Sequence, residues 1–147
     1  MDEEKLENLL RDNAEVINKD PYVFMYLVKL GYIFSLSEPE QNYIESLFIN
    51  SGIDTSLNGA PKIQVSDHVK VVNKGSRYNS YNNFFYDHGI TNLLDNYPAD
   101  VEDGDTGKVI FIGEHSNSHL NVYVVKMDNR ISKDIILIGR SGIILDQ

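Results

Sequence analysis

The sequence predicts an α+β protein, in which a helical N-terminal unit at residues 1–60 precedes a five-stranded antiparallel β-barrel domain at residues 61–147. Two observations lead to this prediction. Apolar residues recur at helical spacing as far as Gly52, whereas from Asp67 onward they form short β-branched runs separated by turn residues. In addition, the first two of these runs are separated by an insertion, residues 74–102, that is too long for a simple hairpin loop.

Composition limits the class of protein. Of the 147 residues, 41% are apolar, which suffices for a core of this size, and no apolar run approaches the roughly 18 residues that a membrane span needs. The N-terminus is acidic where a secretory signal would be basic, and the chain has no cysteine for a disulfide framework. We therefore expect a soluble protein of the cytosol or of a larger particle.

The net charge of −9 is concentrated in the helical part. Residues 1–60 hold 4 Lys and Arg against 11 Asp and Glu, whereas residues 61–147 hold 9 against 11. Because such a charge repels phosphate groups, direct binding of nucleic acid or of an anionic membrane is not expected, whereas a protein partner with a basic surface is. The alternative is that the acidity serves only solubility.

Three helices are predicted before the barrel. The first is amphipathic and covers Glu3–Ile17. The second begins with Asp20 as its N-cap and ends at Gly31, and the third begins with a Ser-x-x-Glu capping box at Ser37 and ends near Gly52. The third helix contains no Lys or Arg, so a DNA-reading helix-turn-helix is not expected.

The second predicted helix is unusual because residues 22–30 are apolar nearly all round. One amphipathic neighbour and the outside of a small barrel could not cover such a helix. We therefore predict a homo-oligomer or a larger assembly, with an interface formed by Tyr22, Phe24 and Leu27.

Within the insertion, Ser80 is predicted to cap a short helix, Tyr81–His88. Tyr81, Phe84 and Phe85 would share one face of this helix and cover one end of the barrel, and a ligand cradle is the alternative. The other aromatic residues and the following acidic run are predicted to be exposed. These form the predicted partner-binding surface: Tyr78, Tyr86, Tyr97, Asp100, Glu102, Asp103 and Asp105.

The predicted strands are short and follow one another with turns rich in Gly, Asn, Asp and Ser, so successive strands can pair antiparallel. They cover residues 68–73, 108–112, 121–126, 134–138 and 142–145.

The five strands, the opening Val69-Lys-Val-Val72 and the turn Gly104-Asp-Thr-Gly-Lys-Val109 resemble the small SH3-like barrels of the KOW and Tudor type. Gly104 and Gly107 would supply positive φ and close approach at this turn, with Lys108 facing solvent and Val109 entering the core. More specifically, the stretch Val71–Tyr81, the short helix ending in His88-Gly89 and the closing Ile135-Ile-Leu-Ile-Gly139 look like a module that recurs in small proteins of tailed bacteriophages. The resemblance covers residues 67–145 and implies the barrel fold; unlike the nucleic-acid-binding barrels of this class, the chain has no basic stripe.

Catalytic patterns are weak. His115 and His119 lie four residues apart beside Glu114, which would suit a metal on a helix, but the segment lies between two predicted strands. No thiol nucleophile, hydrolase elbow or phosphate loop is present in the sequence. We therefore expect neither a cofactor nor a metal, and a metal-binding protein or enzyme built on these histidines is the less favoured alternative.

Together these features predict a non-enzymatic, phage-type binding protein that acts through protein–protein contacts. One version is an acidic antagonist of a host nucleic-acid-handling or defence protein. The alternative is a virion accessory or structural subunit. The expected location is accordingly the host cytoplasm or the virion.

Overall fold

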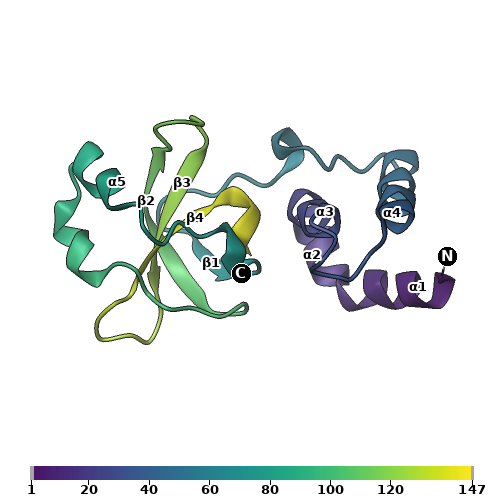
Figure 1. The fold of residues 1–147 in the computed structure, drawn as a ribbon, viewed down its shortest axis with the longest axis horizontal. Coiled ribbons are helices and arrows are strands. Elements are labelled where there is room, and N and C mark those ends of the chain that lie inside the picture. Colours follow the sequence, from purple (N-terminus) through teal and green to yellow (C-terminus); the bar gives the residue numbers. More distant parts are fainter. Residues whose placement is uncertain (1, 147) are drawn as a thin grey trace. The chain divides into compact units, whose positions relative to one another are not determined.

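The structure is a computed structural model that describes residues 2–146. It consists of two compact units, Met1–Lys62 and Ile63–Gln147, which we call the helical unit and the sheet unit. The predicted α+β class is confirmed: helices come first, followed by a five-stranded antiparallel sheet (Figure 1). The units meet in sequence after Lys62, two residues later than the predicted boundary.

The helical unit contains four α-helices, α1 (Glu3–Asp12), α2 (Ala14–Lys19), α3 (Pro21–Lys29) and α4 (Glu38–Asn50), and ends with a 3₁₀ turn at Leu57–Gly59. The prediction of a single helix from Glu3 to Ile17 is wrong in one respect. The helix is interrupted at Asn13, which separates α1 from α2. The side-chain amide of Asn13 donates to the Leu9 carbonyl oxygen over 2.9 Å. Asn competes in this way with the backbone hydrogen bonds of a helix, so the chain breaks there and starts again as α2.

The predicted start signals of the later helices are confirmed. The Asp20 carboxylate accepts from the Val23 amide over 3.2 Å, with Pro21 as the first residue of α3. At α4, Ser37 and Glu40 form a reciprocal capping box. Both pairs supply partners for amide groups that the first helical turn leaves unbonded.

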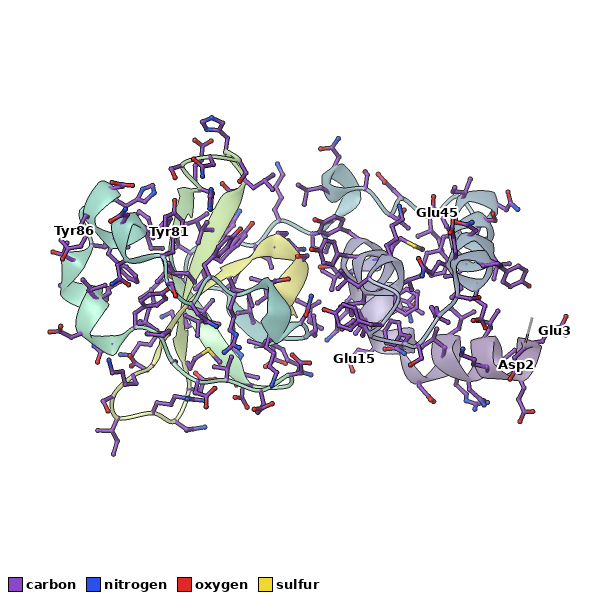
Figure 2. The ribbon with its side chains drawn as sticks, in the orientation of Figure 1. Asp2, Glu3, Glu15, Glu45, Tyr81 and Tyr86 are labelled. Atoms are coloured by element: carbon purple, nitrogen blue, oxygen red, sulfur yellow. The ribbon has the colours of Figure 1, made fainter. Side chains whose placement is uncertain are left out.

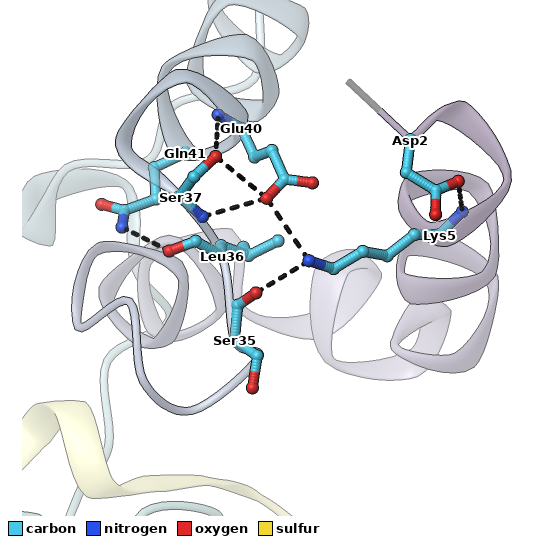
Figure 3. Close-up of polar contacts among 7 residues, drawn as sticks. All are labelled: Asp2, Lys5, Ser35, Leu36, Ser37, Glu40 and Gln41. Atoms are coloured by element: carbon cyan, nitrogen blue, oxygen red, sulfur yellow. Dashed lines mark hydrogen bonds and ion pairs between the residues drawn. The ribbon is translucent and has the colours of Figure 1, made fainter.

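Glu40 also connects α1 to the beginning of α4 (Figure 3). One of its carboxylate oxygens accepts from the Ser37 amide at 3.0 Å and from the Lys5 ammonium at 3.3 Å, and Lys5 donates in addition to the Ser35 carbonyl oxygen at 2.7 Å. Hydrogen bonds from Ser37, with a smaller contribution from Lys5, lower the pKa of Glu40. The charge pair therefore has a structural role in this unit.

Phe24 lies in the middle of the helical core. Its side chain is fully buried, and its ring lies 5.7 Å from those of Phe34 and Phe48. Leu27, which was predicted together with Phe24 to form an oligomer interface, is only 5% exposed, and Tyr22 is half-buried. Phe24 and Leu27 are therefore not exposed for contact with a second copy, because the folded chain already covers them.

The sheet unit contains β1 (His68–Val71), β2 (Thr106–Glu114), β3 (Asn121–Met127), β4 (Ile135–Gly139) and β5 (Ile143–Leu145), with a 3₁₀ turn, η4 (Arg140–Gly142), between the last two. All neighbouring strands are antiparallel, and their order is β4-β3-β2-β1-β5. β4 and β5 thus lie at opposite edges. The sheet is open, and the prediction of a closed barrel is wrong.

The outer edge of β4 is bonded by the insertion instead of by β5. The Tyr78 amide donates to the Leu137 carbonyl oxygen at 2.8 Å, and the Ala99 amide donates to the Ile135 carbonyl oxygen at 2.7 Å. Because the insertion satisfies these groups, β4 needs no strand partner on that side. This explains why the sheet stays open at β4.

The insertion also covers a face of the sheet, as Figure 1 shows for α5 (Asn82–Asp87) and the turns that follow it. Alternate residues of β3 and β4 enter two different cores. One core contains Val125 and Ile136, and the other contains Val124 and Leu137, packed against Phe84 and Phe85. The predicted burial of these two phenylalanines is therefore confirmed, but they cover a face of the open sheet and not one end of a closed barrel. Tyr81, and not Ser80, is the N-cap of the helix.

The positive φ and the close approach predicted for Gly104 and Gly107 are confirmed, although Gly107 lies in β2 and not in the turn before it. Gly104 has a φ of +99°, and a Cβ atom on Gly107 would lie 2.6 Å from the Lys126 carbonyl oxygen. Lys108 is exposed and Val109 is fully buried. Over the described residues 2–146, no helix has the length and apolar character that crossing a membrane requires.

Candidate functional site

A pocket of about 670 Å3 lies where the turn before β2 meets the turn between β3 and β4. Two carboxylates, Asp105 and Asp128, line it together with the Arg130 guanidinium. Its other lining residues are Gly104, Thr106, Met127, Asn129, Ile131 and Ser132. We call it the loop pocket, and its polar lining makes it a candidate for binding charged groups.

Arg130 ties the two sides of the loop pocket together. One of its guanidinium nitrogens donates to the Asp100 carbonyl oxygen at 2.5 Å, and the other lies 3.2 Å from the Asp105 carboxylate. Asp105 in turn accepts from the Glu102 amide at 2.9 Å. Residues 100–105, which we call the acidic loop, thus form an ordered turn with internal hydrogen bonds.

Lys74 contacts the same loop from the start of the insertion. Its ammonium lies 2.8 Å from the Glu102 carboxylate, and its amide donates to the Asp103 carboxylate over 2.8 Å. The hydrogen bond and the charge of Glu102 raise the pKa of Lys74. Asp100, Glu102 and Asp103 are nevertheless exposed, as predicted, and Asp105 is half-buried.

The wall of the loop pocket continues into a cluster around His68. The Asp128 carboxylate accepts from the Thr106 hydroxyl at 2.7 Å and lies 2.6 Å from Nε2 of His68. These two contacts, Thr106 first, lower the pKa of Asp128. On its other side, Nδ1 of His68 lies 3.0 Å from the Asp146 carboxylate.

The predicted aromatic residues lie elsewhere and do not form one surface. Tyr86 is 62% exposed on α5 (Figure 2), whereas Tyr78 is half-buried, with its ring 5.3 Å from that of His115. The expectation that Tyr97 is exposed is wrong, because it is only 5% exposed. Its hydroxyl donates to the Tyr78 carbonyl oxygen and accepts from the Tyr81 amide, and burial raises its pKa.

The two histidines between β2 and β3 have separate environments. Nδ1 of His115 accepts from the amides of Asn117 and Ser118, at 3.1 and 3.4 Å. His119 has a φ of +61° and lies 3.8 Å from the Glu114 carboxylate. Within residues 2–146, no three His, Cys, Asp or Glu side chains are grouped so that they could hold a metal ion.

Sequence reasoning did not single out His68, Asp128 or Arg130 as site residues. From the sequence, His68 belongs to a predicted strand, and Asp128 and Arg130 lie in the turn between two predicted strands. The contact between His68 and Asp128 spans 60 residues, and no local pattern indicates it. Comparison of the chain with protein families, curated proteins and solved structures found no match.

Proposed function

We propose that this chain is a non-enzymatic binding protein that contacts a protein partner with a basic surface. The main observation in support of this proposal is the negative charge around the loop pocket. Five carboxylates lie on the acidic loop and the pocket wall, and Lys74 and Arg130 each pair with one of them. The five are Asp100, Glu102, Asp103, Asp105 and Asp128. A basic surface would find both a negative field and an open concavity at the same place.

An exposed apolar side chain lies beside these charges. Ile131 lines the loop pocket and is fully exposed, at 104%. Contacts between proteins commonly combine a central apolar group with a charged rim. Ile131 is therefore the residue we assign to close contact, and the carboxylates are assigned to attraction and orientation.

The resemblance to phage proteins gives this proposal a biological setting. We propose that the sheet unit is an SH3-like module of the tailed-phage type whose sheet is left open, and that the protein antagonises a host nucleic-acid-handling or defence protein. The strand order, in which β1 pairs with both β2 and β5, and the 3₁₀ turn before β5 support the assignment.

A virion accessory subunit is the second candidate. Several large apolar side chains of the helical unit are exposed, and such side chains suit permanent packing in an assembly. They are Tyr26, Tyr32, Ile33, Tyr43, Ile49 and Leu57. Mass spectrometry of purified particles separates the candidates, because a constant copy number in the particle supports the accessory subunit and absence from it supports the antagonist.

The acidic surface is tested with a partner captured from host lysate and then purified. The quadruple variant Asp100→Asn, Glu102→Gln, Asp103→Asn and Asp105→Asn keeps the hydrogen-bond acceptors but removes the charge. We expect slower association and a weaker salt dependence, because exposed charges act through steering that salt screens within about 8–10 Å. The matched control is Glu3→Gln, Glu4→Gln, Glu7→Gln and Glu15→Gln on the exposed face of α1 and α2.

The two variants remove the same amount of charge. A difference between their association rates therefore shows that the position of the charge matters. If the control slows association as much as the loop variant does, only the total charge matters. If the loop variant binds with unchanged rate and salt slope, the acidic loop is only a solvated turn, and the proposal for this surface fails.

A further inference from the structure

His68 lies between two carboxylates that come from different parts of the sheet unit. Its Nε2 is 2.6 Å from Asp128, in the turn after β3, and its Nδ1 is 3.0 Å from Asp146, which follows β5. The Asp146 amide also donates to the His68 carbonyl oxygen at 2.9 Å. A single imidazole on β1 thus joins the two segments.

The protonation state follows from the hydrogen-bond inventory. A neutral imidazole carries one N–H donor and one acceptor lone pair, and an ionised carboxylate can only accept. Two carboxylates on opposite nitrogens are therefore both satisfied only when both nitrogens carry a proton. We propose that His68 is a proton-operated clamp, which as the imidazolium holds the β3–β4 turn and the residue after β5 against β1.

Two lysines lie near His68 on strands β2 and β3. Lys108 lies directly across from it on β2, and Lys126 lies across from Lys108 on β3, so both exposed ammonium groups oppose protonation. Asp128 and Asp146 favour it at much shorter range. The hydrogen bond to Asp128, followed by the charges of both carboxylates, raises the pKa of His68 above its ordinary value.

The two arms of the clamp differ in strength. Asp128 keeps the Thr106 hydroxyl as a partner whatever the state of His68, and it makes the shorter contact with the imidazole. The Asp146 carboxylate has a longer contact with the imidazole. Loss of the proton therefore releases Asp146 first, while Asp128 stays in the wall of the loop pocket.

The clamp is tested on the full chain by 1H–15N NMR of the imidazoles, titrated from about pH 5 to about pH 9. Both ring N–H signals of His68 should be present at the acidic end, and its midpoint should lie above the ordinary 6.5. Asp128→Asn should lower the midpoint most and Asp146→Asn less. Glu114→Gln, which removes the exposed carboxylate near His119, is the control and should leave the midpoint of His68 unchanged.

Hydrogen exchange gives the structural readout. The protection factor of the Asp146 amide, which already corrects for intrinsic pH dependence, should fall as His68 loses its proton. In His68→Gln, protection should be low and independent of pH. The inference is overturned if His68 titrates at or below its ordinary value, or if protection at Asp146 stays constant through the titration of His68.

Discussion

The Tyr81 amide donates to the phenolic oxygen of Tyr97 over 3.0 Å, and the same hydroxyl donates to the carbonyl oxygen of Tyr78. One buried tyrosine thus fixes the beginning of the insertion to its end. The insertion bonds the edge of β4 and covers one face of the sheet, so this tyrosine acts on the whole sheet unit.

Tyr97→Phe should lower the free energy of unfolding of the sheet unit by about 1–3 kcal/mol, because it leaves partly buried backbone groups without their partner. Urea denaturation followed by circular dichroism measures the loss. Tyr86→Phe is the control, since Tyr86 is 62% exposed and its change should have almost no effect. Equal stability of the two variants would show that the hydroxyl of Tyr97 is not a structural tie.

Gly107→Ala should destabilise the sheet unit by about 1–3 kcal/mol, because the packed core can accommodate an added methyl group only if the backbone shifts. The new Cβ would lie 2.6 Å from the Lys126 carbonyl oxygen, on the neighbouring strand. Gly139→Ala is a matched control at the end of β4, since its Cβ would meet nothing nearer than 3.8 Å. The midpoint temperatures of thermal unfolding of both variants test this prediction. A lower midpoint for Gly139→Ala than for Gly107→Ala would contradict it.

Features with a local cause were predictable from the sequence. The caps at Asp20 and Ser37 follow from the residue types that bond free amide groups. The glycine at position 107 marks a place where another backbone comes close, and that backbone is Lys126 of the neighbouring strand β3. The break at Asn13 also had a local signal, because a mid-helix Asn with no apolar role competes for backbone hydrogen bonds.

Features that depend on distant residues were not predictable. Tyr97 precedes Pro98 and an acidic run, so its neighbours suggest an exposed loop. Its ring is instead buried against Phe85, and its hydroxyl donates to the carbonyl oxygen of Tyr78, 19 residues earlier. The barrel was predicted closed because five strands were visible, but the edge of β4 is satisfied by Tyr78 and Ala99 of the insertion. The His68 contact to Asp128 is likewise a consequence of the strand order.

His68 predicts a pH-dependent contribution to stability. A raised histidine pKa contributes stability that is fully present below the ordinary 6.5 and is lost as pH rises through the folded value. The lowered pKa of Asp128 contributes stability above its ordinary 3.8, which is lost as pH falls through the folded value. The free energy of unfolding of the wild-type protein should therefore exceed that of His68→Gln most between the two ordinary pKa values, 3.8 for Asp128 and 6.5 for His68. Urea midpoints that differ more at about pH 8 than at about pH 5 would contradict this sign.

Tyr86 separates a binding role from a folding role. Tyr86→Ala should leave the urea midpoint unchanged, because the side chain is 62% exposed, and should raise the dissociation rate if it anchors the partner. Tyr78→Ala would be ambiguous, since its ring packs against those of Tyr81 and His115. Unchanged dissociation of Tyr86→Ala from the captured partner would exclude this tyrosine from the contact.

The predicted self-association is tested better on the exposed side of α3 than at Phe24, which the sequence places in the interface. Phe24→Asp would place a charge in the centre of the helical core and should unfold the helical unit, since even Phe→Ala at a buried site costs about 3–5 kcal/mol. Tyr26 lies on the same helix and is 39% exposed. If α3 contributes to a subunit interface, Tyr26→Asp should give a smaller particle by light scattering while the helical circular dichroism signal is retained. Wild-type protein that sediments as a monomer at high concentration would remove the prediction, and an unchanged particle size for Tyr26→Asp would place any interface away from this face of α3.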